Sequence, residues 1–255
     1  MATALVTGAS AGLGEEFAWQ LATAGHDLVV TARSRDRLSE LADVVSSATG
    51  VEVEILADDL AAVEGREQVA ARLADASHPI SLLVNNAGFG TGVDFAHSTW
   101  EEEAAMHDVL VTAPLRLTHA VLPGMIDRGH GAILNVSSIA AHLSNTTYAA
   151  HKRWVLEFTE ALAGQLHGTG VTATAVLPGL TRTQFHDRPS LEHQKTDYPA
   201  LAWLTAEEVV SAALTGVRRG NVAVTPSVRY AAAGALARLA PARLTRGTGS
   251  MRTRR

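Results

Sequence analysis

The chain has 255 residues, of which 47% are hydrophobic and 18% charged, enough for one large folded domain with a sizeable core. It has no cysteine, which excludes disulfide bonds and thiolate metal sites, and its formal net charge of −5 gives no general reason to expect nucleic-acid binding. The amino terminus lacks the charged region of a signal peptide, and no stretch approaches the ~18 apolar residues that span a bilayer. We therefore expect a soluble cytoplasmic protein without a transmembrane segment.

Short apolar runs rich in Val, Leu and Ile alternate along the chain with longer amphipathic segments. The runs predict buried strands, and the segments carry apolar residues at helical spacing. Strands are expected at residues 2–7, 27–32, 51–57, 80–85, 131–138, 171–178 and 221–226. Helices are expected at residues 14–24, 35–48, 62–76, around 100–127, 148–167 and 206–219. The alternation predicts an α/β fold with a doubly wound parallel seven-stranded sheet, Rossmann-like, in a single domain over residues 1–235.

Two segments depart from this pattern. Residues 181–203, between the sixth strand and the last helix, are irregular, and so long a loop in a compact α/β domain is usually functional. We expect it to form a lid over a substrate. Residues 236–255 carry six arginines and no acidic residue. We interpret this basic tail as a solvated end, with a membrane-surface or partner contact as the less favoured alternative.

A glycine-rich stretch, VTGASAGLG at residues 6–14, follows the first strand. Gly8, Gly12 and Gly14 fall where the chain turns tightly and a ligand approaches the backbone. The helix that follows offers free N–H groups and the positive end of its dipole to a pyrophosphate. A glycine cluster alone is a weak signal, but its position between a strand and an amphipathic helix indicates a dinucleotide site.

Further blocks make the sequence resemble the short-chain dehydrogenase/reductase family. The glycine spacing is TGxxxGxG, and NNAG at 85–88, NVSS at 135–138, YAAHK at 148–152 and PGLTRT at 178–183 follow in the family's order. The resemblance covers roughly residues 3–225, and the combination is specific although each block alone is not. It implies a nicotinamide-dependent oxidoreductase that acts on a carbonyl compound or an alcohol.

The end of the second strand indicates which cofactor is bound. An acidic residue there would hold the ribose hydroxyls of NAD, whereas an arginine would accept the phosphate of NADP. Ala32 stands where the family's acidic residue would be, and Arg33 follows it. Arginines oppose the dipole at a helix start, so an anionic ligand explains Arg33, Arg35 and Arg37 better than a plain basic helix start does. We predict NADP(H), with Ser10 adding a hydrogen bond to the phosphate.

The resemblance implies cofactor contacts from these blocks and from the segment after the third strand, where Asp59 matches the family's adenine-contacting residue. As an alternative, Asp58 and Asp59 are ordinary loop acids. The implied contact residues are Gly8, Ser10, Gly12, Leu13, Gly14, Arg33, Asp59, Leu60, Asn86, Ala87, Gly88, Tyr148, Lys152, Pro178, Gly179, Thr181 and Thr183.

Tyr148 and Lys152 stand four residues apart, so on a helix they share a face. A free tyrosine with a pKa near ~10 is a poor proton carrier at neutral pH, and a neighbouring ammonium is expected to lower that pKa by roughly one to three units. The resemblance makes Tyr148 the general acid/base and has Lys152 also hold the nicotinamide ribose. Such pairs are common without function, but the chain has 19 arginines and only two lysines, so lysine here indicates a chemical requirement.

The resemblance also implies that Ser138, the second serine of NVSS, hydrogen-bonds the reacting oxygen. Two departures from the family pattern lie nearby. The loop from Ser138 to Tyr148 is shorter than in most members, which changes one wall of the substrate pocket. Leu110 replaces the asparagine that kinks the helix in the family and holds a water of the proton relay. We expect leucine to do neither, so that proton exchange takes another route or is slower.

The predicted substrate pocket includes Phe89, His142, Leu143, Phe185 and Tyr198. The aromatic residues of the lid favour an apolar ketone or secondary alcohol, unless they only pack the lid against the core. The eleven histidines form no recognisable metal set, so no metal is expected. His151, next to Lys152, is interpreted as a packing residue.

The helices around 100–127 and 148–167 carry apolar residues on more than one face, which indicates a subunit interface. Members of the family commonly pair through these helices, so we expect a homodimer or homotetramer. The alternative to an enzyme is an NADP(H)-binding sensor or scaffold on the same fold with little turnover. Leu110 and the short loop favour that alternative, and the intact Ser138, Tyr148 and Lys152 oppose it.

Overall fold

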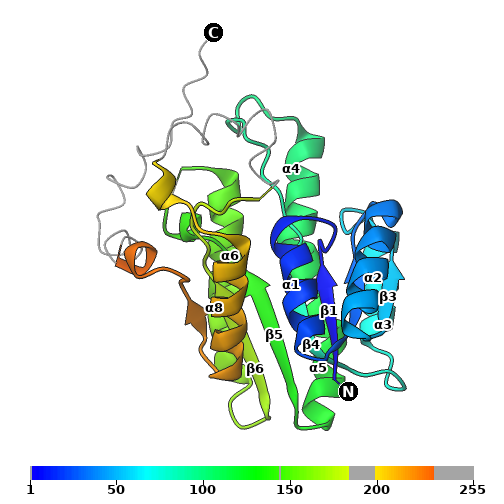
Figure 1. Cartoon of the computed structure of the whole chain (residues 1–255). Coiled ribbons are helices and arrows are strands. Elements are labelled where there is room, and N and C mark those ends of the chain that lie inside the picture. Colours follow the sequence, from blue (N-terminus) through cyan, green and yellow to red (C-terminus); the bar gives the residue numbers. More distant parts are fainter. Residues whose placement is uncertain (1, 144, 184–198, 233–255) are drawn as a thin grey trace.

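A seven-stranded sheet, parallel throughout, forms the centre of the computed structural model, which describes residues 2–143, 145–183 and 199–232 (Figure 1). The strands are β1 (Thr3–Thr7), β2 (Asp27–Thr31), β3 (Val53–Leu56), β4 (Ile80–Asn85), β5 (Gly131–Val136), β6 (Val171–Val176) and β7 (Ala223–Val224). Their order in the sheet is β3-β2-β1-β4-β5-β6-β7, so the winding direction reverses between β1 and β4. The predicted doubly wound parallel sheet is confirmed. β4 has the predicted bounds, and the other strands are shorter than expected, most of all β7.

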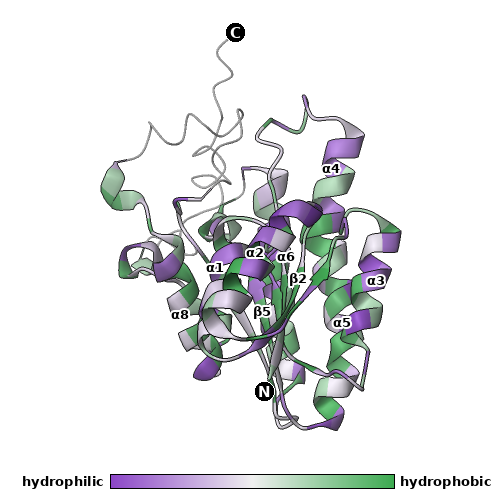
Figure 2. Cartoon of the chain, turned by 45° about the vertical axis from the view of Figure 1, so that its right-hand side comes forward, coloured by the Kyte–Doolittle hydropathy of each residue, from purple (hydrophilic) through white to green (hydrophobic). Residues whose placement is uncertain are grey.

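Helices cover both faces of the sheet. On one face lie α1 (Gly12–Thr23), α2 (Arg35–Thr49) and α8 (Ala206–Arg218); on the other lie α3 (Val63–Leu73), α5 (Ala113–Asp127) and α6 (Thr147–Gln165) (Figure 1). Strand side chains alternate between the two layers, so Val6 packs with Phe17 on one face while Leu5 packs with Leu83 on the other. Hydrophobic residues accordingly concentrate in the sheet and on the inner sides of the helices (Figure 2).

The predicted helix around 100–127 is one continuous stretch with a local change of winding. It consists of α4 (Trp100–His107), a π-helical segment (Asp108–Thr112) and α5, and the N–H of Ala113 donates to the Asp108 carbonyl five residues earlier. Pro114 has no N–H, so the Leu110 carbonyl has no α-helical donor, which favours this rearrangement. The helix is therefore distorted here although Leu110 replaces the asparagine, and the proline suffices to explain the distortion.

The same stretch, residues 100–127, departs from the expectation that no segment is apolar enough to span a bilayer. It is the only helix among the described residues that is long and apolar enough by composition to do so. Its most apolar 18-residue window is 50% buried inside the protein. The α5 part packs on α3, β4 and β5, as the core helix of a folded domain does.

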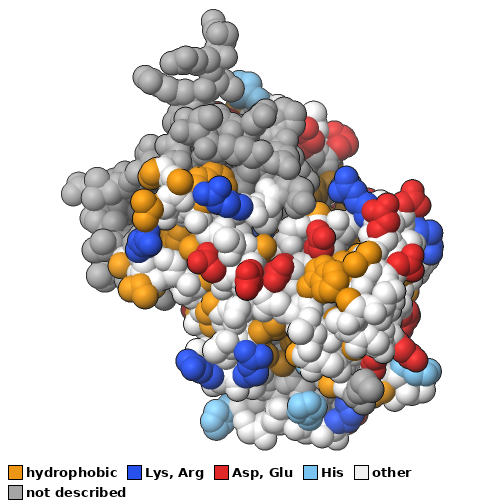
Figure 3. Space-filling view, viewed as in Figure 1, with side chains coloured by type: hydrophobic (Ala, Val, Ile, Leu, Met, Phe, Trp, Pro, Cys, Tyr) orange, Lys and Arg blue, Asp and Glu red, His pale blue; other side chains and the backbone are white. Residues whose placement is uncertain are grey.

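The surface that the described residues form on the side of α1 and α8 carries both signs of charge. Figure 3 shows acidic and basic side chains interspersed with small hydrophobic patches on this side. The predicted tail, residues 236–255, and the predicted domain boundary at residue 235 lie outside the described residues.

Candidate active site

Most of the predicted site residues lie at one edge of the sheet, after the carboxyl ends of five strands. The glycine turn follows β1, Arg33 follows β2, the NNAG block closes β4, Ser138 follows β5 and Pro178 follows β6. In an open parallel sheet, ligands bind at this edge near the point where the strand order reverses. The structure thus gathers segments that are far apart in the sequence into one place.

The turn after β1 has the geometry of an anion site. Gly8 and Gly12 adopt φ angles of 67° and 61°, which side-chain-bearing residues rarely adopt. A Cβ added to Gly8 would lie 2.8 Å from the Cα of Ala87, so the turn packs directly on the next loop. Helix α1 begins after Ala11, which supplies no side-chain cap, whereas Ser34, Thr99, Thr146 and Thr205 cap α2, α4, α6 and α8. The uncapped N–H groups of α1 suit a pyrophosphate.

The NNAG block is fastened to the glycine turn by one threonine and one asparagine. The Thr7 hydroxyl accepts hydrogen bonds from the Asn86 and Ala87 N–H groups, both at 2.9 Å, and donates to the Val84 carbonyl at 3.2 Å. The Asn86 amide donates to the Thr7 and Gly8 carbonyls at 2.9 and 3.3 Å. These bonds fix Asn86, Ala87 and Gly88 beside the turn that would hold the pyrophosphate.

Arg33 stands exposed at the end of β2, where the phosphate of NADP would be recognised. It has no ion-pair partner within the described ranges, so its charge is available to an anion. In the loop after β3, burial raises the pKa of Asp58, and the nearby charge of Arg35 opposes the shift. Asp59 accepts a hydrogen bond of 2.9 Å from the Ala61 N–H, and Leu60 is buried.

The three predicted catalytic side chains come together at the start of α6 and the end of β5. Thr146 caps α6 by accepting from the Ala149 N–H at 3.0 Å, which places Tyr148 in the first turn. The Lys152 ammonium is buried, donates to the Val136 carbonyl at 2.7 Å, and lies 5.7 Å from the centre of the Tyr148 ring. Ser138 is hydrogen-bonded to Tyr148.

The neighbouring serine has a different partner. Ser137 is buried, and its hydroxyl donates to the Lys152 carbonyl at 2.7 Å. Ser138 lies on the other side of the strand end, where it accepts from the Ala140 N–H at 3.1 Å and reaches the Pro178 carbonyl at 3.5 Å. The two serines thus point to opposite sides of the strand end, and the catalytic role of Ser138 stays a prediction.

The electrostatics of the pair differ from the expectation. Burial raises the pKa of Tyr148 to about 12, and the hydrogen bond with Ser138 opposes that shift. Burial also lowers the pKa of Lys152 to about 8. The predicted lowering of the tyrosine pKa is therefore not found, because loss of hydration outweighs the opposing hydrogen bond with Ser138.

Leu110 lies directly behind the lysine. A Cβ added to Gly88 would be 2.9 Å from the Leu110 Cδ2 and 3.5 Å from the Lys152 Nζ, so both side chains meet the same glycine. Leu110 belongs to a buried cluster with Met106 and Val111, against which Phe89, Tyr148 and Trp154 pack. The neighbouring Asp108 faces elsewhere, with its carboxylate 3.6 Å from the Arg66 guanidinium.

His151 is more polar in its contacts than a packing residue. Its Nε2 lies 3.3 Å from the Nδ1 of His107 on α4, and the two rings meet edge to face with centroids 5.2 Å apart. Burial lowers the pKa of His151, and the charges of His107 and Lys152 act in the same direction, while that of Glu103 opposes them. No cluster of metal-ligating side chains is found among the described residues.

The short loop between Ser138 and Tyr148 forms one wall beside the site. It begins with a 3-10 turn (Ile139–His142), and the Arg153 guanidinium on α6 donates to the Ala141 carbonyl at 2.8 Å. The predicted pocket residues His142 and Leu143 lie in this loop, partly buried, and Phe89 packs near Leu110. The other two predicted pocket residues, Phe185 and Tyr198, lie outside the described residues.

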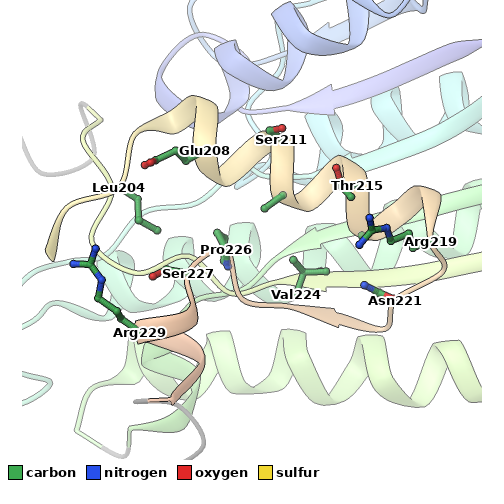
Figure 4. A pocket seen from close by; sticks show the side chains of 12 residues that line it. Leu204, Glu208, Ser211, Thr215, Arg219, Asn221, Val224, Pro226, Ser227 and Arg229 are labelled. Atoms are coloured by element: carbon green, nitrogen blue, oxygen red, sulfur yellow. The ribbon is translucent and has the colours of Figure 1, made fainter. Parts of the chain in front are cut away.

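A separate groove of about 590 Å³ lies between α8 and the chain that follows β7 (Figure 4). Its lining includes Leu204, Glu208, Arg219, Pro226 and Arg229. None of Ser138, Tyr148 and Lys152 lines it, so it is not the predicted catalytic site.

Sequence reasoning missed two features around the site. The first is a buried polar ladder in which the Asn85 amide donates to Asn135 at 2.8 Å and the Asn135 amide donates to Thr159 at 2.9 Å. The second is Tyr230, whose ring packs on Gly179. Asparagines within buried strands were a usable signal for the ladder, and Tyr230 is one of only three tyrosines in the chain.

The glycine turn lies where the strand order of the parallel sheet reverses, and it leads into a helix without a side-chain cap. The Ser–Tyr–Lys group lies next to it. These features together define a dinucleotide-dependent oxidoreductase fold. Residues 2–193 match the family model described as short chain dehydrogenase, and the chain belongs to this family. The predicted family and fold are therefore confirmed.

Individual relatives agree in sequence and in structure. The chain is 37% identical over 180 residues to the NADP-dependent 3-hydroxy acid dehydrogenase YdfG of Escherichia coli, covering 69% of this chain and 71% of that protein. A short-chain dehydrogenase from Sphingobium yanoikuyae in complex with NADPH superposes with a TM-score of 0.85 at 33% identity, covering 92% and 93% of the two chains. The bulky-bulky ketone specific alcohol dehydrogenase from Comamonas testosteroni gives 0.81 at 30% identity, covering 94% and 92%.

Proposed function

We propose that the protein transfers a hydride between NADP(H) and the carbonyl or alcohol carbon of an apolar small molecule, with Tyr148 as the general acid/base. The observation that carries the proposal is the buried group of three side chains: Ser138 hydrogen-bonded to Tyr148, with the Lys152 Nζ 5.7 Å from the ring centre. A protein that only binds a dinucleotide has no need of all three.

NADP(H) is the cofactor, and related proteins agree: one relative is named as NADP-dependent, and one structural neighbour was solved with NADPH. The glycine turn and the uncapped start of α1 would hold the pyrophosphate, and Arg33 would hold the additional phosphate. Asp59 and Leu60 would border the adenine, and the NNAG block would hold the adjoining ribose. Pro178, Gly179, Thr181 and Thr183 would border the nicotinamide, whose ribose would meet Tyr148 and Lys152. When bound, the reduced cofactor supplies the hydride.

The proton is donated by a side chain of the protein. With a pKa of about 12, Tyr148 is protonated at neutral pH, which is the form that donates to a carbonyl oxygen as it gains negative charge. Ser138 would hydrogen-bond the same oxygen and stabilise that charge. A positive charge beside Tyr148 favours loss of its proton, so Lys152 would ease the transfer during the reaction.

An apolar substrate is supported by the side chains nearest to Tyr148. Phe89, Leu110 and Trp154 pack around it, and the side of the site that they form offers little to bind a charged group. The Comamonas relative is specific for bulky ketones, whereas the Escherichia coli relative is named for a 3-hydroxy acid. A substrate panel should therefore include both bulky ketones and an acid related to the 3-hydroxy acids.

The decisive experiment follows NADPH oxidation at 340 nm with apolar ketones, diketones and one 3-oxo acid. Turnover is expected with a bulky ketone, and Tyr148→Phe should lower kcat by at least about 100-fold while leaving the NADPH dissociation constant within about twofold. A parent protein that binds NADPH but turns over none of the panel would instead favour the sensor or scaffold alternative.

We also propose that two copies pair through α5 and α6. Leu115 and Ile126 on α5 are 46% and 40% exposed, and Trp154 stacks on Phe158 along α6 with ring centroids 4.9 Å apart. Unpaired apolar faces of this kind indicate an interface. A sedimentation mass equal to one chain would contradict this arrangement. A soluble, cytoplasmic location likewise stays a proposal, tested by fractionation.

A further inference from the structure

Tyr230 connects the chain after β7 with the loop after β6. Its hydroxyl donates to the Ala202 carbonyl at 2.7 Å and accepts from the Leu180 N–H at 3.1 Å. Its ring lies so close to Gly179 that a Cβ added there would overlap with three of the ring carbons. Gly179 has an ordinary negative φ, so the tyrosine ring, and not the backbone conformation, requires glycine at this position.

The two segments that Tyr230 contacts are also bonded to each other. The Leu204 N–H donates to the Leu180 carbonyl at 2.9 Å, the Arg182 N–H donates to the Leu204 carbonyl at 2.9 Å, and Thr181 and Leu204 form a parallel bridge. The adjacent Arg229 guanidinium donates to the Leu201 carbonyl at 3.0 Å. Figure 4 shows Leu204 and Arg229 at the same end of the groove beside α8. One bonded unit therefore comprises residues 179–182 and 200–204, and the side chains of residues 229 and 230 are hydrogen-bonded to it.

We infer that Tyr230 is a positioning residue that fixes the loop of Gly179 and Leu180 against the nicotinamide end of the cofactor. The inference rests on the proposed function, because that loop follows β6 and carries the motif residues Pro178, Gly179 and Thr181. Tyr230 itself lies beyond residues 2–193, the range that matches the family model, so the resemblance assigns it nothing.

The hydroxyl of Tyr230, and not only its ring, positions the loop after β6. A phenylalanine would fill the same space against Gly179, but it would leave the Leu180 N–H and the Ala202 carbonyl without this partner. Tyr230 is only partly exposed, so water replaces those bonds incompletely. The loop after β6 would then be joined to the segment of residues 200–204 by its backbone bonds alone, and part of its order would have to be restored whenever the cofactor binds.

Binding of two probes to Tyr230→Phe tests the inference. NADPH reaches the loop after β6, whereas adenosine 2′,5′-bisphosphate would occupy only the sites formed by Arg33, Asp59 and Leu60. The Kd for NADPH, from the change in its fluorescence, is expected to rise about tenfold in the variant, and the Kd for the bisphosphate should stay within about twofold. Global weakening of the fold would move both constants, so the difference between the probes isolates the loop.

The matched control is Val228→Ala, two residues earlier in the same segment, where the side chain is 87% exposed. It should bind both probes like the parent. An NADPH Kd in Tyr230→Phe within twofold of the parent value would overturn the inference. A parent protein that binds neither probe would instead overturn the proposed function, so the two failures are distinguishable.

A double-mutant cycle tests the ring contact. Gly179→Ala introduces a Cβ that meets the ring of Tyr230, so it should weaken NADPH binding strongly in the parent. In a Tyr230→Ala background the space is free, and the same substitution should have a smaller effect. Additive effects of the two substitutions on the NADPH Kd would contradict the contact on which the inference depends.

Discussion

The amine of Lys152 reaches past the ring of Tyr148 to the carbonyl of Val136, to which it donates a hydrogen bond of 2.7 Å. The two predicted catalytic side chains share a helix face, and the Lys152 Nζ lies 5.7 Å from the centre of the Tyr148 ring. Lys152 is 4% exposed, and Leu110 and Gly88 close the space behind it. Its charge thus lies in an apolar setting, which determines how both groups titrate.

The free energy of unfolding should depend on the titration of Lys152. Its pKa is about 8 in the folded protein, against an ordinary value of 10.5. Between these values the unfolded chain binds more protons than the folded one, so stability rises with pH. Lys152→Met lacks this group, and the parent should gain about 2 kcal/mol relative to it between pH 8 and pH 10. Urea unfolding at both pH values measures this, and a difference that does not change with pH would contradict the burial of a charged amine.

Replacing Leu110 by asparagine should change the proton chemistry of the site. An amide next to Lys152 stabilises its charged form, so the alkaline limb of the pH–rate profile should move up by about one pH unit, with higher turnover. Leu110→Met, which stays apolar, is the control and should leave the profile in place. If Leu110→Asn matched the parent in rate and profile, a polar group at this position would have no part in proton exchange.

Local sequence patterns predict some parts of this structure and cannot predict others. Short apolar runs act locally, so all seven strands followed from the residues themselves. The pKa of Tyr148 depends on burial by segments far along the chain, and the neighbouring lysine alone suggested the opposite direction. The contact between Tyr230 and Leu180 joins residues 50 positions apart, which no local pattern encodes.

Arg33 should determine the choice between the two nicotinamide cofactors. Arg33→Ala removes a charge-assisted contact to the phosphate of NADP, so the NADPH Kd should rise roughly 10- to 100-fold while the NADH Kd hardly changes. Arg218→Ala, which removes an exposed arginine in the last turn of α8, is the control and should leave both constants unchanged. Equal losses for NADPH and NADH would show that Arg33 does not read the phosphate.

The buried ladder should contribute to stability more than exposed polar residues do. Asn135→Ala leaves Asn85 and Thr159 without their shared partner, so the free energy of unfolding should fall by about 2–4 kcal/mol. Asn221→Ala, at an exposed position before β7, should change it by less than about 0.5 kcal/mol. Denaturant unfolding of the three proteins measures the effect, and similar values for both variants would contradict a structural role for the ladder.

The position of β1 in the sheet has a consequence for how the protein is made. β1 is synthesised before the other strands of the sheet, yet it lies between β2 and β4, with Leu5 opposite Val29 on one side and Leu83 on the other. Until the residues of β4 emerge from the ribosome, one edge of β1 has no native partner. Pairing between strands so far apart is slow, and apolar edges left open during synthesis are prone to aggregation. The strand that leads into the cofactor site is therefore also the one most open to mispairing while the chain is growing.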